Sequence, residues 1–196
     1  KFPDGSNNIG YTRDKQGRTA PIKIMRGQHY RKETNRINPI TKQPEFQQAG
    51  FGLRHVIFMH ENDIMLNSPY NRDSEAKSTD ERIVNFIQNV IANGKVIHRR
   101  NSRNPDQNEV KIVYGKDTYN KYGQSEAQNE MMQDLGWKYM GVVVAHEKVP
   151  SDPRLGGQKF YSIQTAFTEY SDKAMNREQQ AFDNAMKDKV SNRGIE

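Results

Sequence analysis

The chain has 196 residues, a length that suits one domain or one domain with an extension. Only 33% of the residues are apolar and none is cysteine, which excludes disulfide scaffolds, thiolate metal sites and cysteine nucleophiles. No stretch approaches the roughly 18–20 apolar residues of a membrane-spanning helix, and no signal-peptide pattern opens the chain. The first residue is Lys1, which suggests a piece of a longer protein.

The net charge of +6 is concentrated in the first third of the chain. Residues 1–60 contain 11 Lys/Arg against 4 Asp/Glu, a net charge of +7. Residues 61–196 contain 19 Lys/Arg against 20 Asp/Glu, a net charge of −1. Any basic face of the protein therefore depends on where the first third packs.

The first predicted region is polar and has little periodicity. Residues 1–20 are rich in Gly, Asn and Asp, so they are predicted to form a mobile or surface arm. Apolar and basic residues alternate over residues 21–25, which is a weak strand signal. Residues 26–46 are polar and contain Asn-Pro and Gln-Pro steps that break helices, so we expect a loop. The predicted organisation is a basic arm and loop over residues 1–46 and one domain over residues 47–196.

Two helices are predicted next. Residues 51–60 place apolar side chains at helical spacing, and a polar loop is expected over residues 61–78. Ser78-Thr79-Asp80-Glu81 has the form of a capping box, which predicts the start of a second helix. Asn93-Gly94 predicts its end, with a left-handed cap at the glycine. One face of this helix is apolar, at Ile83, Val84, Ile87, Val90 and Ile91.

The rest of the chain favours strands. The predicted elements are strands at 96–98 and 110–114, a short helix near 125–135, strands at 137–145 and 160–167, and a helix at 171–189. Helices that precede a run of strands indicate an α+β fold rather than a doubly wound one. We therefore expect N-terminal helices packed on an antiparallel sheet of four or more strands, followed by a C-terminal helix.

The common signatures of several enzyme classes are missing. The chain has no phosphate-binding glycine loop, no G-x-S-x-G elbow and no H-E-x-x-H pair. Its histidines are scattered, so neither a metal site nor a cofactor is expected. They are His29, His55, His60, His98 and His146.

His55 and His60 are the most notable pair. Five residues on one helix put them about 140° apart around its axis, so both cannot point squarely into one pocket. One interpretation makes one of them a surface or capping histidine. The other makes His55, next to the cationic Arg54, a general base or acid, because histidine titrates near physiological pH.

The predicted strand at 160–167 offers a second group of candidates. Strict alternation would put Tyr161, Ile163, Thr165 and Phe167 on one face of the sheet. Threonine is usually just a good strand former. Alternatively, this face lines a cleft in which Tyr161 and Thr165 donate hydrogen bonds to a phosphate, with Lys159 or the Arg99-Arg100 pair adding positive charge.

Two of these motifs resemble a known family. Residues 50–60, GFGLRHVIFMH, are similar to the G-x-G-L-x-H helix of nucleases from phages and bacterial polymorphic toxins, the barnase/EndoU/colicin/RelE-like (BECR) ribonucleases. Residues 160–167 resemble the terminal strand of that group, which usually ends in T-A-[Y/F]-P; here Thr168 stands where proline is common. The resemblance covers about residues 47–170, and residues 115–136 have no counterpart in it.

The resemblance implies a metal-independent endoribonuclease that cleaves tRNA or another RNA by attack of the ribose 2′-OH. It implies that His55 acts as base or acid and that Thr165 contacts the phosphate. The group's basic catalytic residue has no unambiguous match here. Supporting catalytic candidates are His60, Arg54 and Tyr161, and the RNA-binding candidates are Arg99, Arg100, Lys159 and Lys111.

The resemblance also implies a biological setting. Such domains often form the C-terminal part of a large secreted bacterial protein, act in contact-dependent growth inhibition within the cytoplasm of a target cell, and are blocked by a cognate immunity protein. Other functions stay open: a non-catalytic nucleic-acid-binding module, a DNase, or an ADP-ribosyltransferase toxin. The last normally needs a carboxylate pair that Gln164 to Ala166 does not supply.

Overall fold

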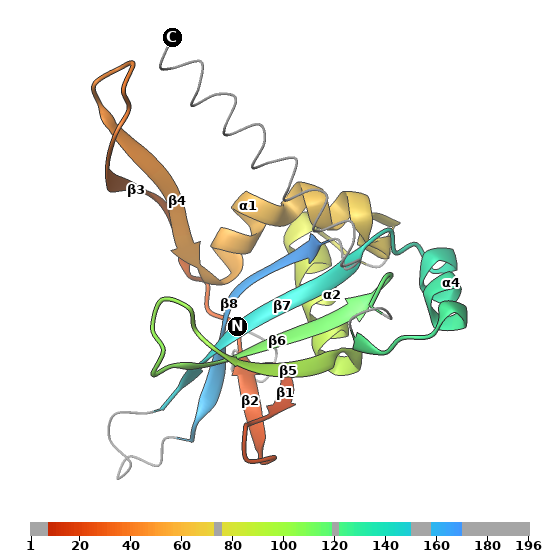
Figure 1. Cartoon of the computed structure of the whole chain (residues 1–196). Coiled ribbons are helices and arrows are strands. Elements are labelled where there is room, and N and C mark those ends of the chain that lie inside the picture. Colours follow the sequence, from red (N-terminus) through yellow and green to blue (C-terminus); the bar gives the residue numbers. More distant parts are fainter. Residues whose placement is uncertain (1–7, 73–75, 119–121, 150–157, 170–196) are drawn as a thin grey trace.

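The computed structural model describes residues 8–72, 76–118, 122–149 and 158–169, and it has an α+β fold. Six strands form one curled sheet, and two more form a hairpin that projects from it (Figure 1). The sheet has the order β1-β2-β8-β7-β6-β5, with β1 Asn8–Arg13, β2 Thr19–Lys23, β5 Lys95–Arg100, β6 Asn108–Gly115, β7 Met140–Lys148 and β8 Phe160–Glu169. The hairpin is β3 Gln28–Ile37 with β4 Pro44–Phe51, and the helical segments are α1 Gly52–Asn67, η1 Pro69–Arg72, α2 Thr79–Asn93 and α4 Glu126–Asp134.

The predicted α+β class is confirmed, but the sheet is mixed rather than fully antiparallel. Strands β5 to β8 form an antiparallel run, whereas β2 pairs with β8 in parallel. The helices are also not N-terminal, because four strands precede α1. The parallel pair brings together strands from near the two ends of the described chain. Patterns within single segments of the sequence do not predict a pairing over such a distance.

The main core lies between the sheet and helices α1 and α2. From α2, the side chains of Ile83, Phe86, Ile87 and Val90 are fully buried in it. Each such side chain contributes about 1.5–3 kcal/mol through its burial. The predicted apolar face of this helix is therefore confirmed, with Phe86 added to it and Val84 only partly buried.

The two ends of α2 differ in how well they were predicted. The Ser78 hydroxyl accepts a hydrogen bond from the Glu81 amide at 3.2 Å, as a capping residue should. Gly94 has a φ of −79°, so the predicted left-handed cap is wrong. A Cβ at Gly94 would lie 2.4 Å from the Val90 carbonyl oxygen and 2.6 Å from Ile112, so glycine is needed for the close approach of helix and sheet.

Residues 8–46 form four strands, so the prediction of an arm and a loop is wrong there, although the strand predicted at 21–25 is borne out by β2. Helix α1 also runs seven residues beyond its predicted end. The strands at 95–100, 108–115, 140–148 and 160–169 and the helix at 126–134 confirm their predictions with modest shifts in bounds. The helix predicted at 171–189 lies outside the described residues. In the part of the chain that is described, no helix is long and apolar enough to span a membrane.

Candidate active site

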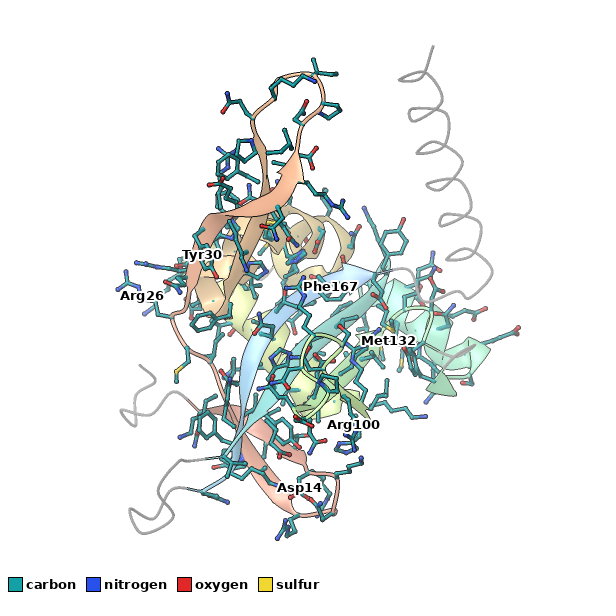
Figure 2. The ribbon with its side chains drawn as sticks, turned by 60° about the vertical axis from the view of Figure 1, so that its left-hand side comes forward. Asp14, Arg26, Tyr30, Arg100, Met132 and Phe167 are labelled. Atoms are coloured by element: carbon teal, nitrogen blue, oxygen red, sulfur yellow. The ribbon has the colours of Figure 1, made fainter. Side chains whose placement is uncertain are left out.

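An open pocket of about 560 Å³ lies where the hairpin, the start of α1, the β5–β6 loop and the middle of β8 meet. Tyr30 on the hairpin and Phe167 on β8, both labelled in Figure 2, line it. The size is in the range of small-ligand sites. Three of the predicted site residues line the pocket, namely His55, Thr165 and Arg99.

A β-bulge in β8 decides which side chains reach this pocket. Val144 pairs with Thr165 and Ala145 pairs with Ile163, so Gln164 is an extra, unpaired residue. Gln164 and Thr165 both line the pocket, whereas Ile163 belongs to the core beneath the helices. The prediction that Tyr161 and Thr165 share one face is therefore wrong, because strict alternation stops at the bulge.

The Thr165 hydroxyl is the most informative atom in the pocket. Its oxygen is buried and has no hydrogen-bond partner among the described residues. A buried polar group without a partner destabilises the fold by about 1–3 kcal/mol, so such groups are rare in native proteins. A hydroxyl in this state at a pocket wall is suited to donate a hydrogen bond to a ligand.

The G-x-G motif fixes where α1 begins and therefore where His55 lies. Gly52 has a φ of +75°, and a Cβ there would come within 2.7 Å of the Met25 carbonyl oxygen. That same carbonyl accepts a hydrogen bond from the Leu53 amide at 3.0 Å and so caps the helix. Gly50, one residue before the end of β4, has a φ of +143°, and a Cβ there would come within 2.1 Å of the Gln28 carbonyl oxygen. Both glycines thus serve the junction that places His55 in the pocket.

Two hydrogen bonds determine the tautomer of His55. The Nε2 atom of His29 lies 2.7 Å from the Gln48 amide oxygen, which can only accept, so this Nε2 donates. The Nδ1 atom of neutral His29 is then an acceptor, and the Nδ1 atom of His55, 3.3 Å away, donates to it. The Nε2 atom of His55 is left with its lone pair, which is the form that a general base requires.

The surroundings of His55 also keep it neutral. Burial lowers the pKa of His55 below 6.5, and the nearby His60 and His29 lower it further. The rings of His55 and His60 are 6.2 Å apart, but His60 does not line the pocket, in keeping with the 140° separation expected from the sequence. Instead, the Nδ1 atom of His60 lies 2.9 Å from a carboxylate oxygen of Asp63.

A buried carboxylate links two further side chains of the pocket. Glu109 is 7% exposed, and its two oxygens contact Arg99 and His146 respectively. The distance from Glu109 Oε1 to His146 Nε2 is 2.8 Å. The Arg99 side chain is 44% exposed, and only its Nε atom contacts the carboxylate. The guanidinium can therefore still bind an anion in the pocket.

Besides His60, two other predicted catalytic residues lie away from the pocket. Arg54 is exposed on α1, and Tyr161 is fully buried with its hydroxyl donating to Glu147 at 3.1 Å. Burial and the Glu147 contact raise the pKa of Tyr161 well above 10. Tyr161 thus stays neutral and stabilises the core side of β8.

Three predicted RNA-binding residues have partners elsewhere and do not line the pocket. Lys159 forms an ion pair with Asp14 at 2.9 Å, and Lys111 forms one with Glu169 at 2.8 Å. Arg100 donates to the Pro105 carbonyl oxygen at 3.1 Å. Among the described residues, no group of three or more His, Asp or Glu side chains could hold a metal ion.

Comparison of the chain with protein-family models, with curated proteins and with solved structures gave no match. Its function is therefore inferred from the pocket itself.

Sequence reasoning missed several pocket residues. The signal for Glu109 was present, since a carboxylate stands directly beside the apolar run of β6. Nothing local marks the others, because His29 on β3 contacts His55 on α1, 26 residues further along the chain, and Gln164 enters the pocket only through the bulge. The pocket residues missed are Arg103, Glu109, His146 and Gln164, and His29, which contacts His55 without lining the pocket, was missed as well.

Proposed function

We propose that this chain is a metal-independent endoribonuclease. One observation supports this proposal above all: His55, Thr165 and the cationic Arg99 line one pocket. His55 has a free lone pair on Nε2, and the buried hydroxyl of Thr165 has no partner among the described residues. In the proposed reaction the ribose 2′-oxygen forms a bond to the adjacent phosphorus and the bond from phosphorus to O5′ breaks. The products are a 2′,3′-cyclic phosphate and a free 5′-hydroxyl.

Two histidines on different walls of the pocket suit the two proton transfers. His55 on α1 takes the proton of the 2′-hydroxyl, and His146 on β7 gives a proton to the leaving O5′ atom. The Glu109 carboxylate, 2.8 Å from the Nε2 atom of His146, holds the imidazole in place for that step. General acid or base catalysis by one such group is worth about 10²–10⁴ in rate.

The remaining groups act on the phosphate. Thr165 donates a hydrogen bond to a non-bridging oxygen, and Arg99 adds positive charge where negative charge builds up in the transition state. Arg103, at the pocket rim in the β5–β6 loop, can contact the same phosphate or its neighbour.

The hairpin supplies a wider basic surface for the RNA backbone. Residues 28–51 contain four Lys/Arg against two Glu, and Lys32 lines the pocket itself. Each phosphate contact made by such a side chain releases a counterion, so the affinity for RNA should fall steeply as salt is raised.

The test is incubation of the protein with total tRNA in EDTA, followed by a denaturing gel and detection of cyclic phosphate ends. We expect cleavage that survives EDTA, is lost in His55→Ala and is retained in His98→Ala, a matched control on exposed β5. Tight binding without cleavage would instead indicate a nucleic-acid-binding module. Cleavage that requires a divalent metal, or cleavage of DNA, would contradict the proposed mechanism.

The family resemblance supports extending the proposal to a toxin that acts in the cytoplasm of a target bacterium and is blocked by an acidic immunity protein. A basic pocket is electrostatically complementary to such a partner. Expression of the chain inside a bacterial host should stop growth, whereas expression of His55→Ala should not. Normal growth with intact wild-type protein would contradict the toxin proposal.

A further inference from the structure

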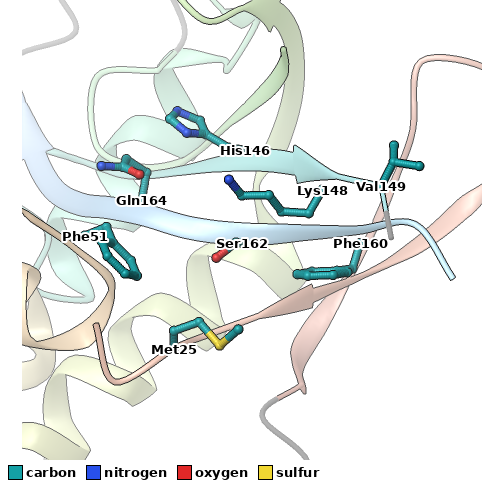
Figure 3. A pocket seen from close by; sticks show the side chains of 8 residues that line it. All are labelled: Met25, Phe51, His146, Lys148, Val149, Phe160, Ser162 and Gln164. Carbon is teal, nitrogen blue, oxygen red and sulfur yellow. The ribbon is translucent and has the colours of Figure 1, made fainter. Parts of the chain in front are cut away.

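A second pocket, of about 470 Å³, adjoins the first (Figure 3). Phe51, His146 and Gln164 line both pockets and so form the boundary between them. A ligand group in the second pocket would therefore lie next to whatever Thr165 and His55 hold. The second pocket is not needed for the bond-breaking steps proposed above.

The lining of this second pocket is mainly apolar and aromatic. Phe51 and Phe160 contribute rings from the β4–α1 junction and from β8, and Met25 adds a thioether. The Nζ atom of Lys23 lies 4.6 Å from the centre of the Phe160 ring, which helps to hold the ring in place. Aromatic side chains of this kind bind flat, apolar-faced groups, and nucleobases stack on them with little dependence on sequence.

A few polar groups lie among the apolar ones. The Gln164 amide nitrogen donates to the Gly50 carbonyl oxygen at 3.0 Å, which leaves the Gln164 carbonyl oxygen as its acceptor. Ser162 is 9% exposed and has a hydroxyl that both donates and accepts, and Lys148 adds a donor. An apolar slot with a few acceptors and donors matches the two faces and the polar edge of a nucleobase.

We propose that this second pocket binds the base of a nucleotide that adjoins the cleaved phosphate and thereby selects the sequence at which RNA is cut. The inference rests on the proposed ribonuclease activity for its biological meaning, because the adjoining phosphate is the one placed at Thr165. Its physical basis is independent of that activity: an aromatic pocket whose boundary is shared with a site suited to a phosphate.

Binding can be tested without any cleavage. The probes are 2′-deoxy dinucleotides of the four bases, which carry a phosphate and two bases but lack the attacking hydroxyl, and inorganic phosphate for comparison. We expect at least one dinucleotide to bind about 10-fold or more tightly than phosphate, and Phe160→Leu to abolish that difference. Tyr11→Leu removes a 62% exposed aromatic side chain on β1 and serves as the matched control. Equal affinity for phosphate and for all four dinucleotides would overturn the proposal.

Cleavage then tests the role in selectivity. Sequencing of the cut ends should show a preference for one base beside the cut in the wild type, and Phe160→Leu should weaken that preference while raising KM more than it lowers kcat. An unchanged cut pattern in correctly folded Phe160→Leu would overturn the inference and leave the ribonuclease proposal intact. A different outcome is a protein that cuts no RNA but binds dinucleotides in a base-dependent way that Phe160→Leu removes. That result would support base binding in the second pocket and overturn the ribonuclease proposal.

Discussion

Replacing Thr165 by valine should make the protein more stable and less active at the same time. Valine keeps the branched shape of threonine and replaces the hydroxyl by a methyl group. Because the Thr165 oxygen is buried without a partner among the described residues, its removal relieves a desolvation cost of about 1–3 kcal/mol. For a chain of 196 residues this corresponds to a rise in Tm of about 2–12 °C.

The same substitution removes the proposed hydrogen bond to the phosphate. Loss of one donor of this kind usually lowers kcat by about 10²–10³. Thermal unfolding followed by circular dichroism measures the first effect, and initial rates on tRNA in EDTA measure the second. Opposite changes in the two quantities distinguish a ligand-binding hydroxyl from a structural one.

Thr12 offers a matched control in the same chain. Its hydroxyl oxygen on β1 is also buried without a partner among the described residues, but it does not line the pocket. Thr12→Val should therefore raise Tm and leave the cleavage rate unchanged. The reasoning fails if Thr165→Val lowers Tm by several degrees, or if it cleaves RNA at the wild-type rate.

Three further predictions concern His29, which contacts His55, and two groups that lie away from the two pockets, Asp14 and Tyr161. His29→Leu removes the acceptor that fixes the His55 tautomer, a bond worth about 0.5–1.5 kcal/mol, so kcat/KM should fall about 2- to 13-fold. It also removes a neighbouring imidazole whose electrostatic effect lowers the pKa of His55, so the acid limb of the pH–rate profile should move to higher pH. An unmoved limb would contradict this. The Lys159 contact and backbone hydrogen bonds lower the pKa of Asp14 to about 2. Because the pKa is lowered in the folded state, the ionised Asp14 stabilises the fold above about pH 4, and this stabilisation is lost as the pH falls toward 2. Asp14→Asn should accordingly lower Tm at pH 7 and flatten the dependence of Tm on pH over that range; a parallel shift at all pH values would refute the assignment. Tyr161→Phe should leave cleavage within about 2-fold and lower the stability by about 1 kcal/mol, as measured by urea unfolding, whereas a large loss of activity would return Tyr161 to the site.

Sequence patterns within single segments correctly predicted the helices and strands that depend mainly on their own capping residues and hydrophobic periodicity. Helix α2 has a capping residue and an apolar face that match its fold, and β7 has a run of valines that suits a buried strand. The hairpin of β3 and β4 lacks such a signal, because most of its side chains are exposed on both faces. Its strands exist because they pair with each other, and polar side chains exposed on both faces leave no hydrophobic alternation to detect.

The candidate site was predictable in part for the same reason. His55 and Thr165 could be selected because histidine suits proton transfer and threonine suits hydrogen-bond donation, and the structure brings both to one pocket. The contact of His29 with His55 spans 26 residues, and the bulge at Gln164 changes the facing of everything before it in β8. Such long-range contacts and bulges depend on tertiary packing. The assumption of strict alternation along β8 therefore placed Tyr161 on the wrong face.

The bulge in β8 also shows how little of the core depends on Gln164. If that residue were deleted, Tyr161, Ile163 and Ala166 would still fall on alternate positions beneath the helices, and Ser162 and Thr165 would fall between them. The shortened strand would be regular, with the same residues in the core. What it would lose is the side chain at the boundary of both pockets and the hydrogen bond that ties β8 to the Gly50 carbonyl. The bulge thus adds one side chain to the boundary between the two pockets while the hydrophobic pattern of the strand is left as it was.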